Sequence, residues 1–166
     1  VRASAGLTVC ARALGADSEA DTWMFTGVVY PLGHQTSAAE LEFARQVSSQ
    51  ARRIAAICTG SFVLAEAGLL SGRRATTHWA YAHAMQKLYP DIQVEDDRIF
   101  ITDGSVWTSA GMTAGIDLAL AMVENDLGAE VARSVAHRLV MHQRRSGGQS
   151  QLSELLDLAP KSDRIQ

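Results

Sequence analysis

Short apolar runs alternate with amphipathic stretches along most of this chain, and this alternation limits the fold more strongly than any other feature. The clearest run is Ile54-Ala55-Ala56-Ile57, which is short and bounded, as in a strand buried on both faces. A helical stretch follows it directly. Strands that alternate with helices are typical of a parallel sheet covered by helices. The sequence therefore predicts an α/β domain with a mostly parallel central sheet.

The other elements are predicted from hydrophobic period and breaker residues. Ser37 and Glu40 have the spacing of a capping box, which indicates a helix start, whereas Gly68 and Pro90 indicate helix ends. We expect helices over residues 37–52, 58–67, 80–88, 113–126 and 129–144, and further strands over residues 6–11, 21–29, 93–94, 99–102 and 106–108.

Composition excludes several classes of protein. The length of 166 residues suits about one domain, and 47% apolar against 20% charged residues can form a sizeable core. Lys and Arg number 15 against 18 Asp and Glu, and the basic residues are scattered, so we expect no DNA binding by this segment itself. No apolar run suits a membrane span and no signal peptide is evident. Two cysteines in unlike contexts favour a reducing, cytoplasmic setting.

The composition changes after Arg145. Residues 146–151 are polar and contain two glycines, which indicates a linker or a docking strap. A short leucine-bearing patch, the breaker Pro160 and a helix start at 162–165 follow. We therefore predict a globular domain over residues 1–145 and a linker over residues 146–166.

Cys58 is the strongest candidate for chemistry. It lies between the buried strand and the next helix, where a nucleophile elbow exposes the side chain and Gly60 allows close backbone approach. The helix N-terminus favours the thiolate, and His78 is the candidate base. The alternative is that Cys58 is simply a small buried residue, as we expect for Cys10 within its strand pattern.

Residues close to these two in the expected fold are candidates for a ligand pocket. Tryptophan side chains there can line a pocket or belong to the core. Histidine pairs five residues apart lack the four-residue spacing of a helical zinc motif, and no glycine-rich phosphate loop is present, so we expect neither a metal nor a cofactor. The candidate ligand-binding residues are Thr59, Gly60, Trp79, Trp107, Gly111 and Met112, with Thr108 and Ser109 beside them.

Several segments together resemble a known family. They are residues 56–60 (AICTG), 72–79 (GRRATTHW), 103–104 (DG), 107–111 (WTSAG) and 113–117 (TAGID). They resemble the class I glutamine amidotransferase-like superfamily of the PfpI type, and more narrowly the N-terminal domain of AraC-type transcriptional regulators. Residues 147–151 (GGQSQ) and 158–165 (LAPKSDRI) resemble the segment that joins this domain to a helix-turn-helix pair.

The resemblance implies a flavodoxin-like three-layer sandwich that forms a homodimer. It also implies a small-molecule effector, and DNA binding through a C-terminal helix-turn-helix domain beyond this segment. Two departures limit what carries over. The family begins with a strand and helix that we expect to precede Val1, and in enzymatic relatives that strand supplies an acid beside the nucleophile. Relatives also have a Gly-Gly turn whose N–H groups can form an oxyanion hole, whereas this chain has residues 29–33 (VYPLG).

Three functional hypotheses follow. The leading one is a non-catalytic domain that senses a ligand and dimerises within an AraC-type regulator. The second is an enzyme, because the Cys58-Thr59 pair and residues 76–79 (TTHW) also resemble isonitrile hydratases, in which the cysteine attacks the substrate carbon. The third is a hydrolase or deglycase-like stress protein that uses Cys58 with His78.

Overall fold

The central sheet is mostly parallel, as predicted. The computed structural model describes residues 1–3, 6–14, 18–141 and 144–152. Four strands form the sheet in the order β1-β2-β6-β5, where the first three are parallel and β5 is antiparallel to β6. Their bounds are β1 (Thr22–Phe25), β2 (Arg53–Ile57), β5 (Phe100–Asp103) and β6 (Val106–Ser109). A separate parallel pair consists of β3 (Arg74–Ala75) and β4 (Gln93–Val94).

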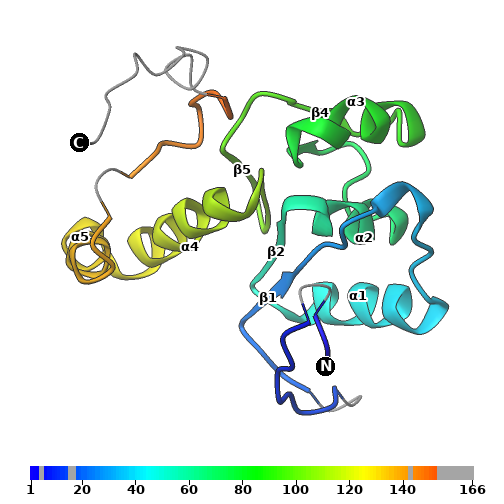
Figure 1. The fold of residues 1–166 in the computed structure, drawn as a ribbon, viewed down its shortest axis with the longest axis horizontal. Coiled ribbons are helices and arrows are strands. Elements are labelled where there is room, and N and C mark those ends of the chain that lie inside the picture. The colour runs from blue at the N-terminus through cyan, green and yellow to red at the C-terminus, as the bar shows by residue number, and fades with distance from the viewer. Residues whose placement is uncertain (4–5, 15–17, 142–143, 153–166) are drawn as a thin grey trace, which may run out of the picture.

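Helices cover both faces of this sheet, which gives the expected three layers. Figure 1 shows α1 (Ala38–Gln50) and α2 (Ser61–Glu66) on one side and α4 (Met112–Leu127) and α5 (Ala129–Arg138) on the other. The helix α3 (Trp79–Leu88) lies near β4, and two short 3-10 helices, η1 (Pro31–Gly33) and η2 (Cys58–Gly60), complete the order.

Strand β2 provides the centre of both cores because its side chains alternate between the two faces. On one face Ile54 and Ala56 pack with residues of α2 and α3, including Leu64 and Met85. On the other face Ala55 packs with Trp107 and with three residues of α4, namely Leu118, Ala121 and Met122. Burial on both faces explains why this strand is apolar throughout its central part.

The helix starts agree with the local sequence. Ser37 accepts a hydrogen bond from the Glu40 N–H, and the Glu40 carboxylate accepts one from the Ser37 N–H. This capping box satisfies N–H groups that have no partner within the helix. The hydrogen bonds with Ser37 also hold the pKa of Glu40 below its usual range.

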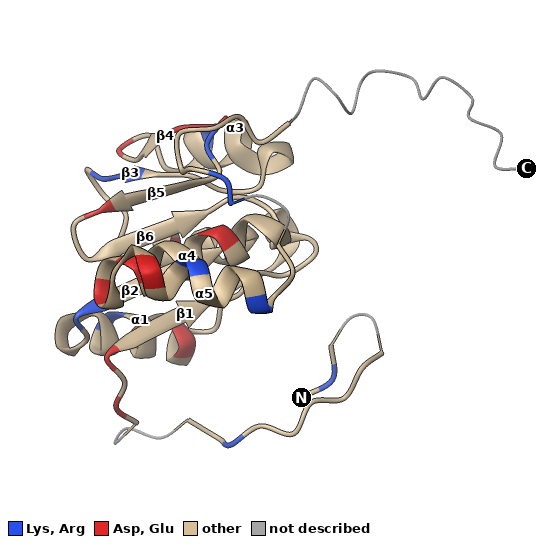
Figure 2. Cartoon of the chain, turned by 90° about the vertical axis from the view of Figure 1, so that its left-hand side faces the viewer, with Lys and Arg blue, Asp and Glu red and all other residues tan. Residues whose placement is uncertain are grey.

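The strand predicted over residues 6–11 is wrong. Within the described chain this stretch forms only an isolated bridge, Arg2 to Thr8, and Leu7, Val9 and Cys10 are exposed. In Figure 2 the N-terminal stretch lies away from the sheet. An apolar alternating segment becomes a strand only where a neighbouring strand can satisfy its backbone, and the described residues place none of the central sheet beside it.

The last helix ends earlier than predicted. Helix α5 stops at Arg138 instead of Arg144, and Val140 takes a left-handed backbone conformation with φ of 53°. The chain then returns to α4, where Arg144 pairs with Glu124 and Arg145 pairs with Asp117. If α5 continued through residue 144, Arg144 and Arg145 would follow the axis of that helix instead of returning to α4. The two ion pairs therefore favour a turn after α5. The segment 153–166, with its predicted helices, lies outside the described residues.

None of the helices in the described ranges has both the length and the apolar character that a membrane crossing requires.

Candidate functional site

Cys58 lies at the carboxyl end of β2 in an uncommon backbone conformation. Its φ is +56°, in the left-handed region that residues with a side chain seldom occupy. Two hydroxyl groups donate to its carbonyl oxygen, Ser61 Oγ at 3.0 Å and Thr77 Oγ1 at 3.1 Å. The side chain is partly exposed. The surrounding hydrogen bonds therefore hold a strained turn between the strand and η2.

Two glycines allow the loop after β1 to lie directly against this turn. A Cβ atom on Gly60 would lie 2.2 Å from the Phe25 carbonyl oxygen, and one on Gly27 would lie 1.9 Å from Thr59 Oγ1. The buried Thr59 hydroxyl donates to the Val28 carbonyl oxygen at 2.7 Å. The close approach expected at Gly60 is thus present. The segment that makes it is 25–28, from the end of β1, ahead of residues 29–33.

The imidazole of His78 is engaged in capping α3. Its Nδ1 accepts a hydrogen bond from the Ala80 N–H at 3.2 Å. A neutral imidazole whose Nδ1 is an acceptor carries its proton on Nε2, and that nitrogen cannot take a proton from a thiol. Within the described part of the chain, Cys58 makes no hydrogen bond with His78 or with a carboxylate. This arrangement lacks the nucleophile–base contact that activation requires.

His78, Trp79 and Gly111 line one small hollow of about 160 Å³. Gly111 faces the His78 ring, since a Cβ atom there would lie 3.4 Å from Cδ2. Trp79 is 54% exposed at the rim. Met112 begins α4, is 84% exposed and is not among the lining residues. The remaining walls come from Ile99, Ala110, Thr113, Ala114, Arg145, Gln151 and Leu152.

Thr59 lines a different hollow, of about 140 Å³, that includes Phe62, Glu66 and Tyr89. Burial is the main cause that raises the pKa of the Tyr89 hydroxyl, and the nearby Glu66 adds to it. Of the residues predicted from the sequence, His78, Trp79 and Gly111 thus line the first hollow and Thr59 the second, whereas neither of these two hollows is lined by Cys58 or Gly60.

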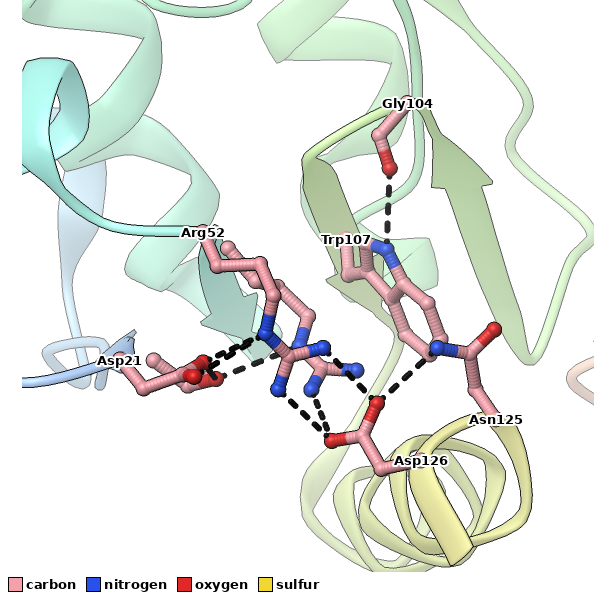
Figure 3. Close-up of polar contacts among 8 residues, drawn as sticks. Asp21, Arg52, Gly104, Trp107, Asn125 and Asp126 are labelled. Atoms are coloured by element: carbon pink, nitrogen blue, oxygen red, sulfur yellow. Dashed lines mark hydrogen bonds and ion pairs between the residues drawn. The ribbon is translucent and has the colours of Figure 1, made fainter. Parts of the chain in front are cut away.

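Trp107 belongs to the core on the α4 side of the sheet. Its indole N–H donates to the Gly104 carbonyl oxygen at 3.2 Å, and the Arg53 guanidinium lies 4.8 Å from its ring centroid. Figure 3 shows Trp107 with Gly104, next to the Asp126 carboxylate that accepts hydrogen bonds from Arg52 and Asn125. Thr108 and Ser109 are also fully buried. Trp107 thus stabilises the end of β2 opposite Cys58 instead of lining the hollow.

Residues 144–152, called the strap here, were missed as contributors to the site. Arg145 bonds to Asp117 and to the Thr113 hydroxyl, and Gln151 contacts the segment just before α3. The available sequence signal is Asp117, an acidic residue within the mostly apolar stretch 112–123 of α4. It is 1% exposed, and a buried carboxylate needs a cation. The sequence indicates a linker or docking strap over residues 146–151, but it gives no signal that the Gln151 side chain lines the site.

The hollow combines an aromatic face, backbone groups and an arginine, which are groups that ligand sites use, and its volume of about 160 Å³ is below the usual range of about 300–1,000 Å³ for small-molecule pockets. Across the residues that the structure describes, no group of three or more His, Cys, Asp or Glu side chains is arranged to hold a metal ion.

Comparison with known proteins gives relatives of two kinds. An isonitrile hydratase from Pseudomonas putida is 46% identical over 99 residues, which cover 60% of this chain and 42% of the hydratase. The HTH-type transcriptional regulator CdhR from Pseudomonas aeruginosa is 42% identical over 103 residues, which cover 62% of this chain and 30% of the regulator. The matched part thus spans less than half the length of either relative.

A solved structure with the same fold is an AraC family transcriptional regulator from Pseudomonas putida. Its TM-score is 0.70 at 19% identity, over 84% of this chain and 75% of that one. The family model for DJ-1/PfpI matches residues 1–125. The fold and the motif segments agree with that match, and the chain belongs to the DJ-1/PfpI family.

Proposed function

We propose that this chain is the ligand-sensing and dimerisation domain of an AraC-type transcriptional regulator, and that it is not catalytic. In this role the hollow beside His78 binds a small-molecule effector, and a helix-turn-helix domain elsewhere in the whole protein binds DNA. The similarity to CdhR supports the regulatory role. Scattered basic residues in the described domain are consistent with DNA binding by a separate domain.

The observation that carries the non-catalytic assignment is the hydrogen bond from the Ala80 N–H to His78 Nδ1. It fixes the tautomer in which Nε2 holds a proton, and it uses the imidazole to cap a helix. The Thr59 hydroxyl is likewise engaged with the Val28 carbonyl oxygen. His78, the candidate base, is then not available to activate Cys58.

The test uses the full-length natural protein. Genomic DNA fragments that it retains should be identified by sequencing, and its affinity for one of them measured by mobility shift at fixed salt. We expect sequence-selective binding that Cys58→Ser leaves within about twofold, which corresponds to less than about 0.5 kcal/mol. Loss of selective binding in the wild-type protein would overturn the proposal.

A second candidate function is the hydration of an isonitrile, in which water adds to the terminal carbon to give an N-substituted formamide. Two observations favour it: the 46% identity with the hydratase and the strained turn at Cys58. Cyclohexyl isocyanide is a suitable probe, with formamide production followed by chromatography. Turnover that Cys58→Ser abolishes and Cys10→Ser leaves intact would establish the enzyme. Equal background rates in all three proteins would exclude it.

A further inference from the structure

The carboxamide of Gln151 occupies a polar recess beside the His78 hollow and satisfies both of its ends there. Its oxygen accepts from the Trp79 N–H at 3.0 Å. Its nitrogen donates to the carbonyl oxygens of Asp96 at 2.7 Å and Thr77 at 3.1 Å, and lies 3.3 Å from Thr76 Oγ1. Thr76 and Thr77 are fully buried. The recess thus offers one N–H donor and three oxygen acceptors, which is the complement of a primary amide.

Other contacts of the strap fix the position of the Gln151 side chain. Asp97 accepts from the Ser150 hydroxyl and from the Gln151 N–H, both at 2.8 Å. The Ile99 N–H donates to the carbonyl oxygens of Gly147 and Gln149 at 3.1 and 3.2 Å. A Cβ atom on Gly147 would lie 2.6 Å from the Phe100 carbonyl oxygen, so this position needs glycine.

The recess and the hollow belong to one site. Gln151 and Trp79 are both wall residues of the hollow, together with Arg145 at the other end of the strap. A molecule in the hollow therefore contacts the strap at two points. One of these contacts, the carboxamide, is made by a single flexible side chain that solvent can reach.

We propose that the strap is a latch whose Gln151 carboxamide is a tethered occupant of the effector site. An effector that carries a primary amide displaces this carboxamide and makes its hydrogen bonds with Trp79, Thr77 and Asp96. The strap is then no longer bound near α3. This inference rests on the proposed sensing function and names the chemical class that the site recognises. Tethering gives the carboxamide a high effective concentration, so the effector needs additional contacts in the hollow to displace it.

The recess can be tested by removing its occupant and supplying a free amide. In the full-length protein, Gln151→Ala should speed hydrogen exchange at the Trp79 N–H about fivefold or more, as expected for the loss of one hydrogen bond. Gln149→Ala, the same change two residues earlier, removes a hydrogen bond from the Ser146 N–H within the strap but keeps the backbone bond from Ile99. Exchange at the Trp79 N–H should therefore stay within about twofold of wild type.

Acetamide should then restore slow exchange at Trp79 in Gln151→Ala, whereas N,N-dimethylacetamide, which has no N–H group, should not. Unchanged exchange in Gln151→Ala, or equal effects of the two amides, would overturn the proposal. If Gln151→Ala lowers overall stability, Gln151→Glu is an isosteric alternative. It replaces the donor nitrogen by an oxygen that faces three acceptor oxygens and cannot donate to them. If the wild-type protein binds DNA selectively but the exchange results differ from those expected, the latch proposal is wrong and the proposed function still stands.

Discussion

The buried carboxylate of Asp117 accepts two hydrogen bonds from Arg145, one from the backbone N–H and one from Nε, both at 2.9 Å. This contact joins α4 to the first part of the strap across 28 residues of sequence. Asp117 is 1% exposed, so its charge depends on Arg145 for compensation.

Removing that compensation should destabilise the domain. Arg145→Ala leaves a buried carboxylate without its cation, and we expect a loss of about 2 kcal/mol, below the usual cost for a fully buried pair because the Arg145 side chain is 34% exposed. Urea unfolding measures the change. Arg144→Ala is the matched control, since its partner Glu124 is 38% exposed where Asp117 is 1% exposed, and this ion pair should contribute less than about 1 kcal/mol. Equal effects of the two substitutions would contradict this account.

The backbone strain at Cys58 gives a second prediction. A φ of +56° penalises any Cβ atom by about 1–2 kcal/mol, while glycine loses more entropy on folding. We therefore expect Cys58→Gly to be more stable than Cys58→Ala by about 0.5–1 kcal/mol. Ala39→Gly, at an exposed position in α1, should instead destabilise by about 1 kcal/mol. A Cys58→Gly protein that melts below Cys58→Ala would show that the turn is not strained in solution.

The contact between the β1 loop and the η2 turn gives a third. Gly60→Ala places a Cβ atom 2.2 Å from the Phe25 carbonyl oxygen, and displacing backbone should cost about 2 kcal/mol. Gly33→Ala has open space and a backbone that other residues adopt, so it should change stability by less than about 0.5 kcal/mol. Thermal melts of both proteins provide the comparison, and a tolerated Gly60→Ala would refute the close approach.

Acid sensitivity provides a fourth. The hydrogen bonds from Arg52, with further ones from Asn125 and Arg53, hold the pKa of Asp126 well below its ordinary range. A carboxyl group whose pKa is lowered in the folded state stabilises the fold at pH values above its pKa in the unfolded chain, about 3.9. This stabilisation is lost as the pH falls below that pKa towards the lower pKa of the folded state.

The melting temperature of Asp126→Asn should therefore lie furthest below wild type at neutral pH, and the gap should narrow below about pH 4. Asp91→Asn serves as the control, because the Asp91 side chain makes no ion pair within the described chain. The difference in melting temperature between Asp91→Asn and wild type should be small at every pH. A gap for Asp126→Asn that widens in acid would contradict the assigned role of the carboxylate.

Local signals in the sequence were sufficient for much of the fold. The apolar run at 54–57 is the central strand, and the spacing of Ser37 and Glu40 is a working capping box. Both depend on a few neighbouring residues, whose preferences the final packing does not override. The strand predicted over 6–11 failed because a strand needs a neighbour, which periodicity cannot supply.

The candidate site was harder to predict because its contacts are non-local. Gln151 meets Trp79 across 72 residues, and polar contacts of that separation leave no periodic pattern. Trp107 was considered for the pocket because aromatic residues suit both a pocket and a core. Its place beside Arg53 depends on the register of β2 and β6, which pairs Ala55 with Trp107.

In the role we propose, this domain senses a ligand for a DNA-binding protein and does not use Cys58 as a nucleophile. The most direct measurement compares wild-type and Cys58→Ser full-length protein for selective binding to a DNA fragment recovered from the genome. We expect selective binding of equal affinity in both proteins. Absence of selective DNA binding in the wild-type protein, together with turnover that depends on Cys58, would contradict it.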